Sequence, residues 1–220
     1  MVEIKDVVRT YLVDNQPVHA LRGITLNIPK GKLVILKGPS GSGKTTILNI
    51  IGGLDQPTSG TVLFQGRDLT KFSERELTTW RRKQIGFVFQ TSPLIQILSA
   101  FENVELALRI NRVPWAEREK RTNRALEIVG LRKRASHRTF ELSGGEQQRV
   151  GIARAIVTEP ELILADEPTG ELDFATGMQV MQLFKELVRE RGITICVATH
   201  DPATMQFGDI VYELHDGEII

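Results

Sequence analysis

The segment that most constrains the fold runs from residue 38 to residue 45 and reads Gly-Pro-Ser-Gly-Ser-Gly-Lys-Thr. It fits the pattern G-x-x-x-x-G-K-S/T, in which glycines let the backbone wrap closely round a phosphate and aim its N–H groups inward. A short apolar strand at 32–37 precedes the segment, and a helix at 46–51, ended by Gly52-Gly53, follows it. This context favours a phosphate cradle, at the start of a helix dipole, over a glycine-rich turn that matches by chance.

Each residue of this loop, with the threonine after it, is predicted to bind a nucleotide. The set is Gly38, Pro39, Ser40, Gly41, Ser42, Gly43, Lys44, Thr45 and Thr46. We expect Lys44 to reach the β- and γ-phosphates and to take part in catalysis, while the Thr45 hydroxyl binds Mg²⁺. The Thr46 hydroxyl is free for a further phosphate oxygen.

A second phosphate-binding element lies about a hundred residues later, at 142–147, and reads Leu-Ser-Gly-Gly-Glu-Gln. We expect a helix to start near Glu146 and to present its positive end to a phosphate. One nucleotide needs only one cradle. The second element therefore requires an explanation that a single chain does not supply.

Composition places the 220 residues among soluble globular proteins of one domain. The net charge of +1 gives no field that favours nucleic acid, and no apolar run approaches the roughly 18 residues of a membrane span. The first six residues are charged and alternating, unlike a signal peptide, so cytoplasmic synthesis is the expectation. Cys196, the only cysteine, stands in an apolar run and is predicted to be a small buried hydrophobe.

The order of apolar patterns predicts an α/β protein with three parts. Short alternating strands at 2–8, 24–28 and 61–65 suggest a small antiparallel sheet, and helical spacing dominates from about 94 to 150. Further strands are expected at 85–90, 162–165, 193–198 and 210–213, with a core-facing helix stripe at 178–188 and a hairpin turn at Asp216-Gly217. Continuous apolar strands that alternate with helices imply a parallel sheet covered on both faces. The charge-rich segments at 71–82, 117–124 and 131–138 are interpreted as solvated helix faces.

Polar residues at strand ends supply candidates for the metal and the water. Asp166 ends an apolar strand, where a carboxylate is well placed to hold Mg²⁺, directly or through water. Glu167 should point elsewhere because strand side chains alternate, which suits a general base for water. Gln90 is expected to end a strand and to ligate Mg²⁺ or hold a water, and His200 to contact the γ-phosphate or the water. Alone, either residue is more often structural.

Together these residues resemble the ATP-binding subunit of an ABC transporter over essentially the whole chain. The matching motifs are Walker A at 38–45, the Q-loop at Gln90, the signature at 142–147, Walker B at 162–167, the D-loop at 171–173 and the switch histidine at His200. The resemblance implies a P-loop NTPase core of the RecA-like type, formed by 1–93 and 151–220 with the antiparallel sheet, and a helical signature subdomain at 94–150. Residues 81–90, 142–150 and 164–170 are similar to the subgroup of macrolide exporters and lipoprotein-releasing complexes. Glu171 departs from that subgroup, in which Asn or Ala is expected.

The resemblance also implies roles. Tyr11 would stack on adenine. Ser143 and Gly145 would contact the γ-phosphate of ATP held by a second copy of the chain. Gly144, Glu146 and Asp173 would belong to the same nucleotide site, and Asp173 would communicate between the two sites. Two ATP molecules, with Mg²⁺, would then close a homodimer across a two-fold axis. A membrane permease would dock near residues 90–103, where 91–95 supply apolar surface.

Three functions compete at this stage. The leading hypothesis is an exporter-type or mechanotransmitting ATPase that works at the cytoplasmic face of the inner membrane as a peripheral subunit. The second is a soluble ABC ATPase that acts on DNA or ribosomes, although long coiled coils, a second ATPase unit and a basic footprint are all lacking. The third, a P-loop kinase or GTPase, leaves 142–147 and His200 without a role. Drugs, lipoproteins, haem, peptides and lipids remain open as cargo.

Overall fold

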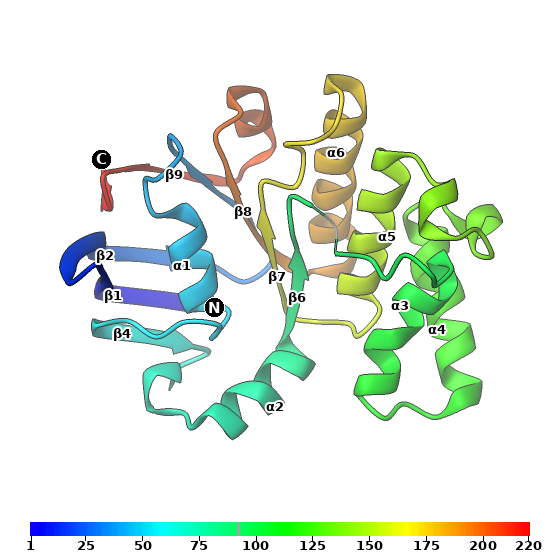
Figure 1. Ribbon diagram of the computed structural model, residues 1–220, viewed down its shortest axis with the longest axis horizontal. Coiled ribbons are helices and arrows are strands. Elements are labelled where there is room, and N and C mark those ends of the chain that lie inside the picture. The colour runs from blue at the N-terminus through cyan, green and yellow to red at the C-terminus, as the bar shows by residue number, and fades with distance from the viewer. Residues whose placement is uncertain (92) are drawn as a thin grey trace.

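The computed structural model describes residues 1–91 and 93–220 and contains two sheets (Figure 1). The smaller sheet is antiparallel with the order β2-β1-β4-β5. Its members are β1 (Val2–Val13), β2 (Gln16–Ile28), β4 (Ser59–Phe64) and β5 (Arg67–Asp68). The predicted antiparallel sheet is thus confirmed. Its first two strands are longer than predicted, because polar and exposed residues continue the pairing as far as Val13 and Gln16.

The larger sheet has the order β10-β9-β3-β8-β7-β6 and is parallel except for β10. Its members are β3 (Leu33–Lys37), β6 (Ile85–Val88), β7 (Leu162–Asp166), β8 (Thr194–Thr199), β9 (Ile210–His215) and β10 (Glu218–Ile219). The hairpin that joins β9 to β10 turns at Asp216 and Gly217, both with positive φ, as predicted. Parallel strands of this kind bring the loops that follow their carboxyl ends to one edge of the sheet.

The two faces of this sheet are buried against different layers. Along β3, Leu33 and Ile35 belong to one apolar cluster, whereas Val34 and Leu36 belong to the other, as the strand pleat requires. The cluster of Val34 and Leu36 contains α1 (Lys44–Ile51) and the small sheet. The opposite cluster contains α3 (Ala100–Ile110), α4 (Trp115–Ile128), α5 (Gly144–Ile156) and α6 (Phe174–Arg191). Figure 1 shows α1 and α5 on opposite sides of the central strands.

Helices account for most of the region between 69 and 156. A short 3₁₀ turn (Leu69–Lys71) leads into α2 (Glu74–Gln84), which lies in a segment predicted to be a solvated helix face. The helical segments between α4 and α5 are two 3₁₀ turns, Arg132–Arg134 and Thr139–Glu141. The prediction of a helix face at 131–138 is therefore wrong, because no regular α-helix forms there. A last 3₁₀ segment (Pro202–Phe207) precedes β9. The predicted subdomain boundary at 150 falls inside α5, which continues without a break to Ile156.

Candidate nucleotide site

The phosphate loop leaves the carboxyl end of β3 and enters α1 through backbone that favours glycine. Gly41 and Gly43 have φ of 82° and 100°, in the left-handed region. A Cβ on Gly43 would lie 2.7 Å from the carbonyl oxygen of Ala20 in β2. A Cβ on Gly38 would collide with the carbonyl oxygen of Leu214 in β9. Two neighbouring strands therefore hold this loop, and the glycines permit the close approach.

The Lys44 side chain folds back over the phosphate loop that precedes its own helix. Its ammonium donates to the carbonyl oxygens of Gly38, at 2.8 Å, and Pro39, at 2.9 Å, and its side chain is only 6% exposed. The same nitrogen is 3.8 Å from Oε1 of Glu167. A buried ammonium with these neighbours places one positive charge between the loop and the end of β7.

The hydroxyl of Thr45 donates to Oδ1 of Asp166 at 3.2 Å, which joins the start of α1 to the end of β7. Burial and the nearby Glu167 raise the pKa of the Asp166 carboxyl, against the hydrogen bond from Thr45 and the charge of Lys44. In residues 1–91 and 93–220 no group of three or more His, Cys, Asp or Glu side chains gathers round a metal position. One hydroxyl and one carboxylate fit Mg²⁺, which takes few protein ligands and binds chiefly phosphate and water.

Glu167 reaches the same site, but not by the alternation expected of a strand. It lies one residue past β7 with φ of 45°, a left-handed conformation uncommon outside glycine. Its Oε1 is 2.9 Å from Nδ1 of His200, and its Oε2 accepts from the His200 backbone N–H at 3.4 Å. The two carboxylates have different partners, since Asp166 accepts from Thr45 whereas Glu167 contacts His200 and lies near Lys44.

Gln90 lies two residues beyond β6 rather than at its last position. Its amide nitrogen would be 3.2 Å from a Cβ on Gly170, so the side chain lies beside the loop that follows β7. Among the hydrogen bonds of the described residues, none joins Gln90 to Thr45 or Asp166. Its proposed contact with Mg²⁺ stays a prediction.

Two residues that sequence reasoning missed surround Tyr11 on β1. The Tyr11 hydroxyl donates to Oδ2 of Asp55 at 2.6 Å, and the guanidinium of Arg9 lies 4.3 Å from the ring centroid. Arg9 also binds both oxygens of Asp55, at 2.9 and 2.7 Å. One ring face is thus covered by Arg9, and the phenol is fixed by Asp55. Glu3, Lys5 and Arg9 stand at odd positions of β1, and this partial alternation, interrupted at Val7, is the only hint of Arg9 in the sequence.

The second glycine-rich segment forms the N-terminus of α5 and is capped by its own side chains. The Ser143 hydroxyl accepts from the Glu146 N–H at 3.3 Å, and Oε2 of Glu146 accepts from the Ser143 N–H at 2.9 Å. The backbone hydrogen bond from Ser143, with further help from the Ser143 hydroxyl and Arg134, lowers the pKa of Glu146 against the opposing effect of burial. The helix starts at Gly144, two residues earlier than predicted.

The segment at 171–173 lies beside this helix start. Asp173 caps α6 by accepting from the Thr176 N–H at 3.1 Å and from its hydroxyl at 2.6 Å. A Cβ on Gly145 would lie 2.5 Å from Cγ2 of Thr176, so Gly145 allows α5 and α6 to approach each other. Glu171 accepts a hydrogen bond from the hydroxyl of Thr91 at 3.3 Å. This contact joins the segment after β6 to the segment after β7.

Comparison with known proteins places this geometry in a family. Residues 21–170 match the family model described as ABC transporter. The chain belongs to the ABC transporter family. It is an ATP-binding subunit and an ATPase, as the motifs indicate. No helix within 1–91 and 93–220 has both the length and the apolar character needed to cross a bilayer.

Three relatives cover the whole chain. The first is MJ0796 of Methanocaldococcus jannaschii, an uncharacterized ABC transporter ATP-binding protein, 47% identical and matched over 95% of its length. The second is the lipoprotein-releasing system ATP-binding protein LolD of Syntrophus aciditrophicus, 42% identical and matched over 99%. The third is the macrolide export ATP-binding/permease protein MacB of Wolinella succinogenes, 44% identical over 34% of its length. The dimeric post-hydrolysis structure of MJ0796 with ADP and Pi superimposes with a TM-score of 0.92 over 100% of this chain and 96% of that chain, at 46% identity.

Proposed function

We propose that two copies of this chain close on two ATP molecules and thereby drive an associated membrane permease of the exporter or mechanotransmitting type. The observation that carries the proposal is the separation of the two phosphate-binding helices. α1 and α5 belong to apolar clusters on opposite faces of the central sheet. One phosphate cannot contact both within one chain, whereas two chains in head-to-tail contact complete each site. The dimeric structure of the neighbour MJ0796 supports this arrangement.

In the proposed reaction, one oxygen of Glu167 accepts a proton from the attacking water as that water bonds to the γ-phosphorus. The bond between the γ-phosphorus and the bridging oxygen of ADP breaks in the same step. His200, 2.9 Å from Glu167, would orient the carboxylate, and Lys44 would balance charge on the phosphates. Thr45 and Asp166 would hold Mg²⁺, which supplies charge neutralisation at the β- and γ-phosphates when bound.

Adenine recognition is assigned to the exposed face of Tyr11. The ring is held from behind by Arg9 and at its hydroxyl by Asp55, so the platform is fixed before the base arrives. Strand pairing places Tyr11 opposite Val18 on β2, the strand whose Ala20 contacts Gly43 of the phosphate loop. These contacts support one continuous nucleotide site from β1 to α1.

The permease would dock at the segment that follows β6. Phe89, Ile95 and Ile97 are exposed there, with Ile97 77% exposed. Leu94, predicted as docking surface, is instead buried in the core, and Ser92 lies outside the described residues. Relatives that release lipoproteins or export macrolides support the exporter type, and docking on a permease would hold the chain at the cytoplasmic face of the membrane.

The test is Glu167→Gln, which preserves size and hydrogen bonding but removes the base. We expect ATP binding within about twofold of wild type, hydrolysis slower by about 10²–10⁴-fold, and an ATP-bound dimer on size-exclusion chromatography. Glu213→Gln, at an exposed position paired with Lys37, is the matched control and should turn over normally. Turnover by Glu167→Gln at the wild-type rate would remove Glu167 from the mechanism. A variant that binds ATP but stays monomeric would contradict the dimer.

A further inference from the structure

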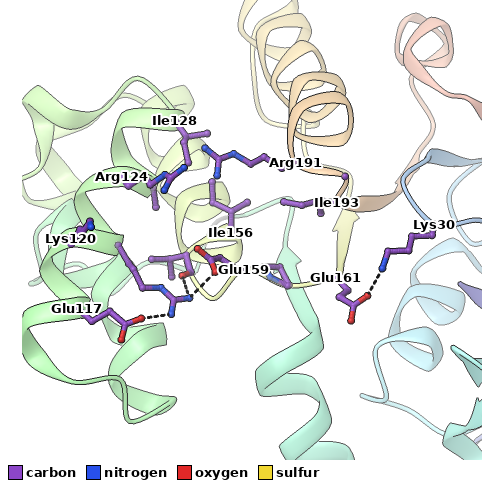
Figure 2. A pocket seen from close by; sticks show the side chains of 15 residues that line it. Lys30, Glu117, Lys120, Arg124, Ile128, Ile156, Glu159, Glu161, Arg191 and Ile193 are labelled. Atoms are coloured by element: carbon purple, nitrogen blue, oxygen red, sulfur yellow. Dashed lines mark hydrogen bonds and ion pairs between the residues drawn. The ribbon is translucent and has the colours of Figure 1, made fainter.

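A pocket of about 710 Å³ opens at the edge of the central sheet opposite the phosphate loop (Figure 2). Its lining includes Glu161 and Ile193, which immediately precede β7 and β8, whereas the phosphate loop follows the carboxyl end of the parallel neighbour β3. The segment proposed to meet the permease follows the carboxyl end of β6. The pocket is therefore remote from both surfaces assigned to ATP and permease. Its volume lies within the range of small-molecule sites.

The floor of the pocket is apolar and belongs to the main core. Ile156 and Val157, at the end of α5, and Ile193 are buried, and Ile128 of α4 packs against the same cluster. A ligand that covers this floor would remove apolar surface from water, which favours binding in proportion to the area covered. The floor therefore suits a hydrocarbon segment.

The rim of the pocket carries more positive than negative charge. All three lining acids have partners, since Glu161 pairs with Lys30 at 3.2 Å, and Glu117 and Glu159 pair with Arg121 at 3.1 and 3.9 Å. Three further cations, Lys120, Arg124 and Arg191, line the pocket without an ion pair to any residue the structure describes. The rim thus has a surplus of positive charge that the protein itself does not neutralise.

Two of these cations converge. Figure 2 shows the side chains of Arg124, from α4, and Arg191, from the end of α6, reaching toward one another across the pocket. Like charges repel, and this repulsion is relieved when an anion lies between them. A guanidinium also presents a planar fork of donors that matches the oxygens of phosphate or carboxylate.

We propose that this pocket binds a small soluble amphiphile, with a phosphate or carboxylate head held by Arg124 and Arg191 and a short hydrocarbon tail on the floor of Ile128, Ile156 and Ile193. The volume of about 710 Å³ and the two-part chemistry favour this ligand over an acidic peptide, which would need a longer groove. A bound ligand would connect α4 to the C-terminal end of α6. The site is separate from ATP chemistry and does not depend on the proposed dimer.

The experiment is isothermal titration calorimetry of the whole chain with octyl phosphate and octanoate below their micellar concentrations, in the presence of saturating ADP and Mg²⁺. ADP occupies the phosphate loop, so added phosphate groups report on the pocket. We expect one saturable site per chain. The amphiphile that binds with the higher affinity identifies whether the site prefers a phosphate or a carboxylate head. Inorganic phosphate, which lacks the tail, and octanol, which lacks the charge, should each bind at least about tenfold more weakly.

Arg124→Gln and Arg191→Gln should each weaken the preferred amphiphile about tenfold or more, and the double variant should abolish saturable binding. Arg189→Gln is the matched control, because it removes an exposed arginine of the same helix that lies outside the pocket and pairs with Glu190. Circular dichroism melts confirm that each variant is folded. No saturable binding to wild type, equal binding to the double variant, or equal affinity for inorganic phosphate would overturn the proposal. Binding of a glutamate-rich peptide without binding of either amphiphile would overturn it in favour of peptide docking.

Discussion

The N-termini of α1 and α5 follow the two glycine-rich segments of the chain, yet they satisfy their backbone N–H groups in different ways. Gly43 at the start of α1 gives no side-chain cap, and the first turn contains no acid. Ser143 and Glu146 at the start of α5 form a complete capping box, as Ser73 and Glu76 do at α2. The first helix start therefore leaves its N–H groups for a phosphate, while the second has already used part of its capacity.

This difference indicates an order of events. The Glu146 carboxylate places a negative charge where a phosphate would approach α5, and Arg134, 3.2 Å away, offsets that charge only in part. The Ser143 hydroxyl accepts from the Glu146 N–H but can still donate its own hydrogen to a phosphate oxygen. We infer that α5 binds phosphate weakly alone and engages ATP that the other copy already holds at α1.

The largest expected effect comes from Lys44→Ala. The variant loses a buried ammonium that bridges the phosphate loop and Glu167, so ATP affinity should fall about 100-fold or more. Calorimetry with a non-hydrolysable ATP analogue measures the loss. Lys71→Ala removes an exposed lysine and should bind normally. Wild-type affinity in Lys44→Ala would mean that α1 is not the primary phosphate site.

Glycine-to-alanine substitutions in the two glycine-rich segments distinguish effects on folding stability from effects on dimer assembly. Gly43→Ala should cost about 1–3 kcal/mol of unfolding free energy, because φ is 100° and the new Cβ meets the Ala20 carbonyl. Gly144→Ala has open space round the added Cβ and a helical backbone, so stability should be unchanged or rise by up to about 1 kcal/mol. Urea denaturation gives both numbers.

In the background of Glu167→Gln, Gly144→Ala should nevertheless weaken the ATP-dependent dimer, since the methyl lies where the partner's phosphate is proposed to approach. Size-exclusion chromatography at graded protein concentration measures this. An unimpaired dimer would contradict the contact assigned to the start of α5.

Removing the charge of the α5 cap should act in the opposite direction. Glu146→Gln keeps a side chain that can cap the helix but removes the negative charge near the incoming phosphate. The ATP-dependent dimer should tighten about two- to fivefold. Glu76→Gln makes the same change in the capping box of α2 and should leave the dimer unaffected. An equal response from both variants would show that the effect arises from general charge and not from a phosphate at α5.

The contrast between the two helix starts also shows what sequence alone could supply. Local order predicted the strand, loop and helix round Lys44, and strand-end placement predicted Asp166, which the Thr45 hydroxyl contacts. Contacts over long sequence separation were not predictable, because they depend on how strands pair. Arg9 and Asp55, which fix Tyr11, are 46 residues apart.

Departures from regular backbone geometry and the burial of single apolar residues were equally unpredictable from the sequence. Glu167 lies past the end of β7 in a left-handed conformation, which strand alternation does not anticipate, and from there it contacts His200 and lies near Lys44. Leu94 was predicted as docking surface but is buried in the apolar cluster that includes α3, since apolar character alone does not distinguish burial from exposure.

The smallest expected effects concern the pH dependence of stability. Replacing Asp166, which contacts the start of α1, and replacing Glu146, which caps α5, should change the unfolding free energy with opposite sign. Hydrogen bonds lower the pKa of Glu146, so the stability it contributes is present above the unfolded pKa of about 4.3 and is lost as pH falls through the folded value. Burial raises the pKa of Asp166, so a stability cost develops as pH rises above the unfolded pKa of about 3.9 and is complete above the folded value. Without nucleotide, Asp166→Asn should therefore be more stable than wild type near neutral pH, and Glu146→Gln less stable.

Both stability differences from wild type should shrink on acidification. The difference for Asp166→Asn should shrink at a higher pH than that for Glu146→Gln, because the folded pKa of Asp166 is raised and that of Glu146 is lowered. Urea midpoints from about pH 7 to about pH 2 follow the two curves. The same sign for both variants would mean that α1 and α5 do not differ electrostatically as the capping pattern indicates. Opposite signs would show that the start of α1 is prepared to bind phosphate together with Mg²⁺. They would also show that the Glu146 cap stabilises the start of α5 until a second copy of the chain supplies the nucleotide.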